Sequence, residues 1–206
     1  MAGKVFFSVS MSLDGFIAPD SPKELMGKQW MELQQWIFPL RFFRERLKLG
    51  QGGEEGRDND IVRETFERTG ASVMGKRMFD AGERAWPEEA PFHVPVFVVT
   101  HQKRAPWVRP GGTTFYFIND GIESALGQAR EAAGDRDVRV AGGGATILEY
   151  VNAGLIDEFT VSLSPVLFGS GIRLFEGVDA SRVALEPVRA EPSPRVTHLT
   201  YIVRKR

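Results

Sequence analysis

The fold is decided by one stretch, VRVAGGGAT at residues 138–146. It predicts a short strand over 138–141, a hinge of three glycines, and a helix from Thr146 to Asn152 that Gly154 ends. Glycine lets a ligand approach the backbone closely, and the free N–H groups of a first helical turn point at bound oxygens. The stretch therefore has the form of an anion site, although tight packing alone also explains such a turn.

Strands and helices alternate on both sides of this stretch. Strands are predicted at 4–13, 71–74, 94–100, 114–118 and 158–168. One helix is predicted to start at Asp58, Asn59 or Asp60 and to end at Gly70, and another to start at the capping box Asp120/Glu123 and to end at Gly134. This alternation indicates βαβ units and a parallel sheet. Residues 183–190 and 196–203 have no helix between them, which predicts an antiparallel hairpin at the sheet edge.

Composition narrows the function. The chain has 206 residues with 42% hydrophobic and 26% charged residues, as in one ordinary globular domain. A net charge of −1 argues against nucleic-acid or membrane partners. The chain has no cysteine, and its three histidines are far apart, so no metal site is expected. We expect a cytoplasmic protein, because no signal peptide or membrane-length apolar run is visible.

Two further turns suit a phosphorylated ligand. Gly75-Lys76-Arg77 follows one predicted strand, and the stretch from Thr100 to Arg104, which includes Lys103, follows the next. Ligands of open α/β sheets bind beyond the carboxyl ends of the strands. Three such turns after three adjacent strands fit one extended ligand with several phosphates, although lone lysines and arginines are more often solvated.

Residues 19 to about 58 differ in character from the rest of the chain. Trp36, Leu40, Phe43 and Leu47 keep a helical spacing, and a Gly/Glu-rich run follows from Gly50 to Gly56. The spacing predicts an amphipathic helix that covers the core or a dimer contact. A substrate lid, with Trp30 or Trp36 at the pocket, is the alternative.

The motifs resemble those of the dihydrofolate-reductase-like superfamily, in particular the C-terminal reductase domain of bacterial riboflavin-biosynthesis deaminase/reductases. The similar segments, in order, are MSLDGFIA at 11–18, VMGKRMFD at 73–80, AGGGAT at 141–146, GLIDEF at 154–159 and PVLFGSG at 165–171. The resemblance implies a three-layer α/β/α fold with a mostly parallel sheet and a C-terminal antiparallel hairpin. It covers one domain, residues 1–206, with an insertion at about 19–58.

The resemblance also implies bound NADPH and hydride transfer to a small heterocycle, a pyrimidine or pterin-like compound. Its predicted cofactor-binding residues are Ser10, Ile17, Ala18, Gly75, Lys76, Arg77, Thr100, Lys103, Gly142, Gly143, Gly144, Ala145 and Thr146. Asp14 and Trp36 are the expected substrate contacts. The cationic turns favour NADPH over NADH, and a flavin is the less favoured cofactor.

The sequence departs from the two best-known activities. The riboflavin enzymes carry a substrate-holding glutamate before the glycine turn, where this chain has Ala141. Folate reductases carry an acid early in the helix before the Gly-Lys-Arg turn, and Asp60 is the expected proton donor here, with Asp58 as a rival. A dihydrofolate-reductase-like enzyme and a catalytically silent NADPH-binding dimer therefore remain alternatives. We expect a homodimer, because residues 196–203 would otherwise form an open edge strand.

Overall fold

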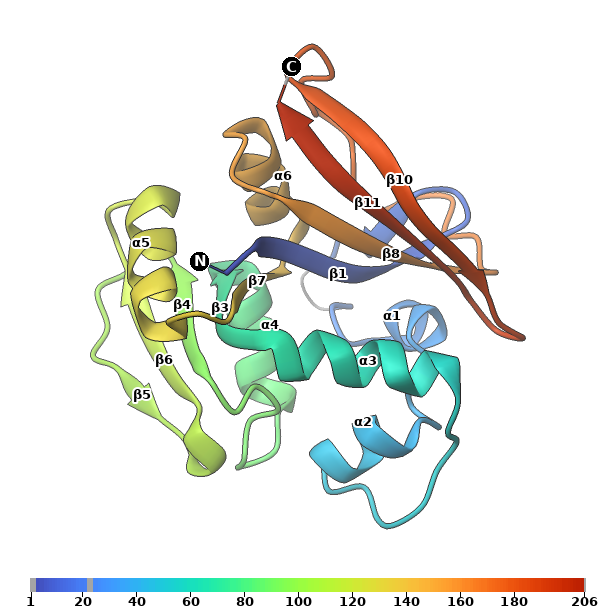
Figure 1. Cartoon of the computed structure of the whole chain (residues 1–206). Helices are drawn as coiled ribbons and strands as arrows, with labels where there is room; N and C mark the ends of the chain where they lie inside the picture. Colours follow the sequence, from blue (N-terminus) through green and yellow to red (C-terminus); the bar gives the residue numbers. More distant parts are fainter. Residues whose placement is uncertain (1–2, 22–23, 206) are drawn as a thin grey trace.

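The computed structural model describes residues 3–21 and 24–205 (Figure 1). Within them, one sheet has the strand order β10-β11-β8-β1-β7-β3-β4-β6-β5. Its strands are β1 (Val5–Ser12), β3 (Thr69–Gly75), β4 (Pro95–Val99), β5 (Trp107–Val108), β6 (Thr114–Ile118), β7 (Asp137–Gly142), β8 (Glu158–Ser164), β10 (Val183–Pro192) and β11 (Thr197–Lys205). A second, two-stranded sheet pairs β2 (Phe16–Ala18) with β9 (Ile172–Arg173).

The strand directions confirm the predicted fold class. Strands β8, β1, β7, β3, β4 and β6 are parallel neighbours. Strands β11 and β10 continue the sheet antiparallel beyond β8, as the predicted hairpin requires. The three strands that precede the predicted ligand turns, β7, β3 and β4, lie side by side, which brings their carboxyl ends together.

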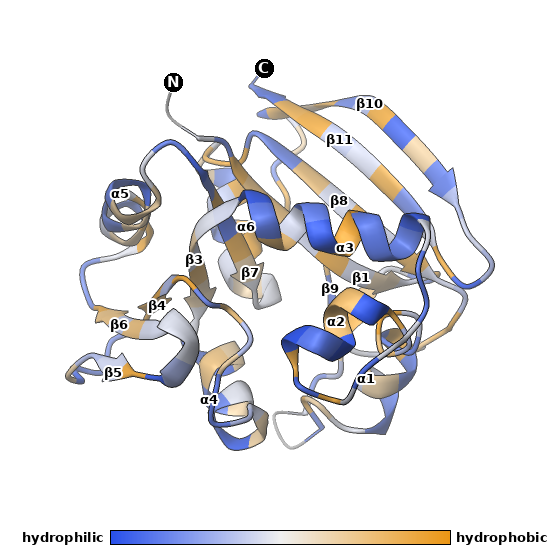
Figure 2. Cartoon of the chain, turned by 60° about the horizontal axis from the view of Figure 1, so that its bottom comes forward, coloured by the Kyte–Doolittle hydropathy of each residue, from blue (hydrophilic) through white to orange (hydrophobic). Residues whose placement is uncertain are grey.

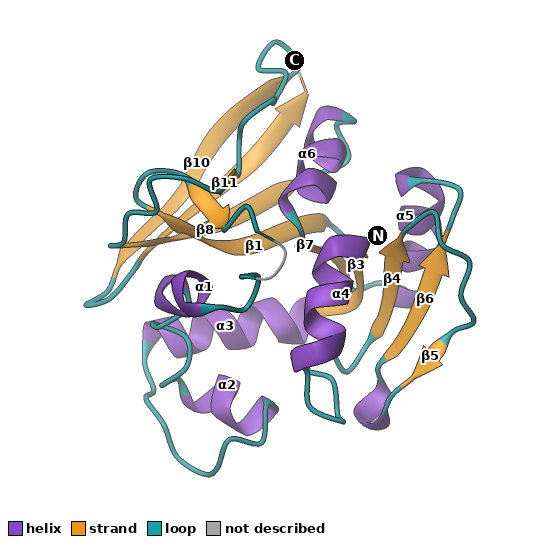
Figure 3. Cartoon of the chain, turned by 180° about the vertical axis from the view of Figure 1, so that it is seen from behind, coloured by secondary structure: helices purple, strands orange, loops and turns teal. Residues whose placement is uncertain are grey.

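Helices cover both faces of the sheet (Figures 1 and 3). They are α1 (Lys28–Leu33), α2 (Arg41–Arg46), α3 (Arg57–Arg68), α4 (Lys76–Ala85), α5 (Ile122–Ala133) and α6 (Gly144–Asn152), with a short 3₁₀ turn at Pro110–Gly112. Helices α5 and α6 pack on one face over an aliphatic and aromatic core. Helices α1, α2 and α3 gather on the other face, beneath β1 and β8 (Figure 3). Figure 2 shows α3 as hydrophilic over most of its length, with apolar residues between its polar turns.

Alternation along β1 and β8 makes the two sheet faces chemically different. In β1, Val5 and Phe7 enter the core with α5 and α6, and the alternate positions carry Phe6 and then three serines. In β8, Phe159 and Val161 do the same. The opposite face is therefore polar, and its residues are Ser8, Ser10, Ser12, Thr160, Ser162 and Ser164. The insertion and α3 cover this polar face.

The insertion differs from its predicted form. The expected helix from Trp36 to Leu47 is wrong, because the chain forms α1, a turn, and then α2. Pro39 lies between the two helices, has no amide hydrogen and disfavours helical geometry in the residue before it. Trp36 and Leu40 are nevertheless buried with Val62 of α3 and Val196, so the apolar spacing reports burial rather than one continuous helix.

Three local predictions are also wrong. Helix α3 begins after Gly56, so Asp58, Asn59 and Asp60 lie in its first turn rather than at its N-cap. Gly121, not the predicted capping box, is the N-cap residue of α5. The open edge of the sheet is β10 rather than residues 196–203, because β11 lies between β8 and β10. Across residues 3–21 and 24–205, the helices are too short or too polar to cross a membrane.

Gly70 belongs to β3 instead of ending α3, and it marks a close contact between β3 and α5. A Cβ atom at Gly70 would lie 2.8 Å from Cα, Cβ and the carbonyl oxygen of Ala133. Because two backbones would have to separate, we expect Gly70→Ala to lower the free energy of unfolding by about 1–3 kcal/mol. Thermal unfolding measures this loss as a fall of several degrees in the midpoint.

Gly127 in α5 provides the matched control. Open space surrounds its Cβ position, so Gly127→Ala should leave stability unchanged or raise it by up to about 1 kcal/mol through helix propensity. If Gly70→Ala unfolds at the same temperature as Gly127→Ala, the β3–α5 contact is not the tight one that the structure shows.

Candidate functional site

A cavity of about 1590 Å³ lies between the polar sheet face, α3 and the insertion, and extends to the carboxyl ends of β7, β3 and β4. Most of the predicted site residues line it. These are Ser10, Ile17, Ala18, Gly75, Lys76, Arg77, Thr100, Gly142, Gly143, Gly144, Ala145, Thr146 and Trp36. Residues from six separate parts of the sequence therefore meet at one place. Their roles in binding remain predictions.

The glycine turn at the start of α6 is closely packed at Gly144, and against Gly75 of β3, and is open at Gly143. A Cβ at Gly75 would lie 2.2 Å from Thr146 Oγ1, so only glycine there allows β3 and α6 to approach this closely. A Cβ at Gly144 would meet Ile172 at 2.8 Å and Ile17 at 3.1 Å, which are neighbours in the β2–β9 sheet. A Cβ at Gly143 would have no atom of the described residues within 4 Å. The turn therefore presents its free backbone to the cavity at Gly143.

The cationic turns are only partly directed at the cavity. Lys76 lines it and is held by Asp80, four residues along α4. Arg77 also lines it and donates a hydrogen bond to the carbonyl of Asp20 at the start of the insertion. Thr100 is buried, and its hydroxyl accepts a hydrogen bond from the amide of Gln102. Lys103 is exposed and does not belong to the cavity lining.

Asp14 lies outside the cavity lining, contrary to the expected substrate contact. Its carboxylate accepts hydrogen bonds from Ser12 Oγ at 2.6 Å and from the amides of Phe168 and Gly169. The Ser12 hydroxyl, followed by these amides, lowers the pKa of Asp14 to about 2. Asp14 thus ties the β1–β2 turn to the loop after β8, which is the role of a turn residue.

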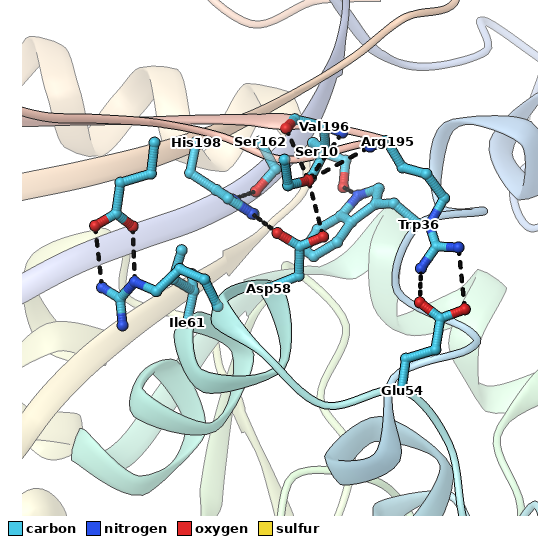
Figure 4. Close-up of polar contacts among 12 residues, drawn as sticks. Ser10, Trp36, Glu54, Asp58, Ile61, Ser162, Arg195, Val196 and His198 are labelled. Carbon is cyan, nitrogen blue, oxygen red and sulfur yellow. Dashed lines mark hydrogen bonds and ion pairs between the residues drawn. The ribbon is translucent and has the colours of Figure 1, made fainter.

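Asp58, rather than Asp60, is joined to the cavity. Asp60 is half-exposed and pairs with Arg63 on the same helix, away from the cavity lining. Asp58 points toward His198, as Figure 4 shows, and its Oδ1 lies 3.1 Å from Nε2 of His198. Nδ1 of His198 lies 2.9 Å from the hydroxyl of Ser162, which lines the cavity. Of the two acidic candidates, Asp58 thus contacts the cavity through His198 and Ser162, whereas Asp60 does not, and a role in proton transfer stays a prediction for either.

The partners of His198 fix its tautomer. Burial lowers the pKa of His198, and the nearby carboxylate of Asp58 opposes this only in part. A neutral imidazole has one donor and one acceptor nitrogen. Because the Asp58 carboxylate can only accept, Nε2 carries the hydrogen and Nδ1 accepts from Ser162. The Ser162 hydroxyl hydrogen is thereby occupied, and its oxygen lone pairs remain for a donor in the cavity.

Strand pairing places the hydrogen-bonded residues His198 and Ser162 beside Trp36. Ser10, Ser162 and His198 are direct neighbours across β1, β8 and β11. The indole N–H of Trp36 donates to Ser10 Oγ at 3.0 Å, and the indole meets the His198 ring edge-on at 5.1 Å (Figure 4). Trp36 is 4% exposed and lines the cavity, as does Trp30. The insertion is thus packed onto the polar face as a fixed wall.

Sequence reasoning missed His198, Ser162 and Arg139. Arg139 on β7 lines the cavity among apolar residues of α3. The alternation Ser8-x-Ser10-x-Ser12 and Thr160-x-Ser162-x-Ser164 was a readable signal, because a buried strand with polar residues on one face needs partners there. The link from Ser162 to His198 was not readable, since strand pairing across 36 residues creates it.

Comparison with known proteins identifies related folds. The model of the RibD C-terminal domain family matches residues 3–199. The curated "Uncharacterized protein YyaP" of Bacillus subtilis (strain 168) is 35% identical over 86 residues, which is 41% of this chain and 45% of that protein. The match thus spans less than half of that relative.

Solved structures extend the similarity over the whole chain. A Shewanella sp. PV-4 protein assigned to riboflavin biosynthesis has a TM-score of 0.67 at 22% identity and covers 98% of this chain and 99% of its own. Dihydrofolate reductase from Enterococcus faecalis, complexed with NADP(H), has a TM-score of 0.54 at 16% identity with 98% of both chains covered. A Thermotoga maritima diaminohydroxyphosphoribosylaminopyrimidine deaminase/5-amino-6-(5-phosphoribosylamino)uracil reductase reaches 0.59 at 18% identity, with 98% of this chain and 56% of that chain covered. The fold is shared with all three.

Because of His198, the free energy of unfolding should depend on pH. A histidine whose pKa is lowered by folding takes up its proton more readily when unfolded, so its contribution to stability is complete above about pH 6.5 and is lost as the pH falls below that value. We expect the free energy of unfolding of the wild type to fall from pH 7.5 toward acid more steeply than that of His198→Asn. Denaturant unfolding at a series of pH values measures both slopes.

His93 is the necessary comparison, because burial lowers its pKa as well. His93→Asn should remove its own share of the slope and leave the share of His198 in place. Equal slopes in the wild type and in His198→Asn would show that His198 is not buried in its neutral form.

Proposed function

The chain belongs to the RibD C-terminal domain family, and from this premise we propose that it is a riboflavin-pathway-type reductase that binds NADPH and reduces a small heterocycle. The glycine turn carries the proposal. Gly143 faces the cavity with room for a ligand, at the N-terminus of the nine-residue helix α6. The backbone N–H groups there suit a diphosphate.

The volume of the cavity supports two ligands. Pockets for one small molecule are commonly about 300–1,000 Å³, whereas this cavity is about 1590 Å³. A cofactor can therefore lie along the ends of β7, β3 and β4 while a substrate lies between the polar face and α3. A NADP(H) complex is known for the dihydrofolate reductase of the same fold, which supports the choice of cofactor.

The residues of this chain then divide into binding and positioning roles. Gly143, Gly144, Ala145 and Thr146 would hold the diphosphate, and Lys76 and Arg77 the ribose phosphate. Ser10, Ile17 and Ala18 would border the nicotinamide, which supplies a hydride when the cofactor is bound. These residues belong to separate elements, and only the folded chain brings them together around one cavity.

The substrate side is built to bind a flat ring with N–H donors. Trp36 and Phe66 are aromatic walls, and Ser162 offers an oriented acceptor. Such a ring is found in pyrimidines and pterins. The wall formed by the insertion excludes water from the place of reduction. Asp58 is hydrogen-bonded to His198, and His198 is hydrogen-bonded to Ser162. Asp58 therefore orients the Ser162 hydroxyl through His198 and acts as a positioning residue.

The assembly we propose is a homodimer, supported by the open edge of β10. Leu185 and Val188 on this strand are 49% and 55% exposed, and an exposed edge with apolar residues is usually covered. Light scattering at micromolar concentration should give about twice the chain mass of 23.0 kDa. A mass equal to one chain would contradict the dimer and leave the reductase proposal intact.

Gly143→Val tests the cofactor site directly. The backbone of Gly143 has φ −75°, which valine adopts, and its Cβ direction is open, so the variant should fold. The valine side chain would occupy the space of the diphosphate. We expect wild type to bind NADPH and to oxidise it with a substrate from a pyrimidine and pterin panel, and Gly143→Val to lose binding by at least about 100-fold. Fluorescence titration and the loss of NADPH absorbance measure the two properties.

Controls separate the parts of this proposal. Unfolding of Gly143→Val near the wild-type temperature shows that the loss is local. Normal NADPH binding by the folded variant would refute the anion site. NADPH should bind at least about tenfold more tightly than NADH, because Lys76 and Arg77 can form charge-assisted bonds to the extra phosphate. NADPH binding without any turnover would favour the silent binding protein.

A further inference from the structure

Arg139 is a cation placed on the substrate side of the cavity. Side chains alternate along β7: Val138 and Val140 enter the core beneath α5 and α6, so Arg139 and Ala141 face the opposite side. Both of these residues line the cavity. The guanidinium lies 5.0 Å from the ring of Phe66, on the inward side of α3.

The hydrogen-bonding capacity of Arg139 is nearly unused. Its Nη2 donates one long bond, 3.4 Å, to the carbonyl of Ser8. Its Nε is buried and lacks a partner among residues 3–21 and 24–205, and no carboxylate of these residues pairs with the guanidinium. Burial, with a further contribution from the charge of Arg46, lowers the pKa of Arg139 to about 10. The group is still protonated at neutral pH.

Other arginines of the same layer show what a satisfied guanidinium looks like in this fold. Arg68 pairs with Asp137 at 2.6 Å and with Glu158 at 2.7 Å. Arg46 donates to the carbonyls of Pro91 and Phe92 at 2.7 and 2.5 Å. An unpaired charge away from water is costly. Arg139 lacks such partners, and unlike Arg109, whose Nε is also unpartnered, it lines the cavity.

The cofactor is not the natural partner of Arg139. Arg139 precedes Gly142 by three residues, which is about 10 Å along a strand. Its guanidinium bonds to Ser8 and faces Phe66, on the side of α3, whereas the glycine turn, Lys76 and Arg77 form the phosphate-binding end. A ligand that fills the space between β1 and α3 is the one that meets Arg139.

We propose that Arg139 binds an oxyanion, a carboxylate or a phosphate, carried by the heterocyclic substrate. The planar guanidinium can donate two parallel hydrogen bonds to such a group. The anion site stands on the contacts of Arg139, and its assignment to a substrate rests on the proposed reductase function. The substrate would thus be an acid or a phosphate ester. Its ring would lie between Trp36 and Phe66, and its negative group would contact Arg139 on β7.

Binding of matched probe pairs tests this proposal without requiring turnover. Orotate and uracil differ by one carboxylate, and uridine 5′-monophosphate and uridine differ by one phosphate. Calorimetric titration of the full chain, with and without NADPH, should show that the anionic member of at least one pair binds about 10- to 100-fold more tightly than the neutral member. The pair that discriminates identifies the oxyanion.

Variants assign the preference to Arg139. Arg139→Met removes the charge with little change in length and should reduce the affinity of the anionic probe to that of the neutral one. Arg139→Lys should retain part of the preference. Arg63→Met is the matched control, because Arg63 is a half-exposed cation of α3 outside the cavity lining. NADPH affinity should be unchanged in all three variants.

Stability distinguishes a binding residue from a structural one. Since Arg139 has no ion-pair partner among the described residues, Arg139→Met without ligand should unfold at the wild-type temperature or above it. A lower unfolding temperature in Arg139→Met, with unchanged probe preference, would make Arg139 a structural residue and overturn the proposal. So would equal binding of both members of each pair to the wild type, or absence of binding by every anionic probe.

A loss of NADPH affinity in Arg139→Met would show that Arg139 contributes to cofactor binding, and this result would also overturn the proposal. Failure of the reductase proposal has a different signature. Probe preference that depends on Arg139, in a protein that does not bind NADPH, would keep the anion site and remove the reductase.

Discussion

The polar face of the central sheet is the constraint on which the rest of the structure depends. Strands β1 and β8 place apolar residues beneath α5 and α6, and hydroxyls on the other side. Buried hydroxyls need hydrogen-bond partners, and the fold supplies them from distant segments. The insertion provides Gln34 and Trp36 for Ser10, and the carbonyl of Leu33 for Ser164.

This constraint explains why the insertion is packed rather than loose. A lid that opened fully would leave Trp36, Leu40 and Val62 exposed together with the serine rows. Glu54 and Arg195 add a surface ion pair between the insertion and the hairpin of β10 and β11 (Figure 4), although exposed pairs contribute little to stability. The cavity is therefore bounded by a packed wall on the side of the polar sheet face, and Glu54 ties the glycine-rich segment before α3 to Pro39 and Arg41 as well.

The sequence predicted the layers, and most of the site residues that it proposed do line the cavity, because local motifs specify them. Gly143 and Thr146 were found in this way. Asp14 and Asp60 were assigned from position in a motif, and their side chains turned out to be engaged elsewhere, at Phe168 and Arg63. His198 could not be found, because its role arises from the pairing of β11 with β8 and from the first turn of α3.

The two halves of the cavity are built by different means, and this difference limits what motifs can reveal. The half at the glycine turn depends on backbone segments that approach closely, so its glycines are readable in the sequence. The half at the polar sheet face depends on side chains at alternate strand positions, which can change without disturbing the sheet. On the face of β7 that carries Ala141, Asp137 is paired with Arg68, and Arg139 is the charged residue that lines the cavity. An arginine without an ion-pair partner at this wall is the kind of side-chain feature that alternate strand positions can carry without any motif, and the proposed anion site rests on it.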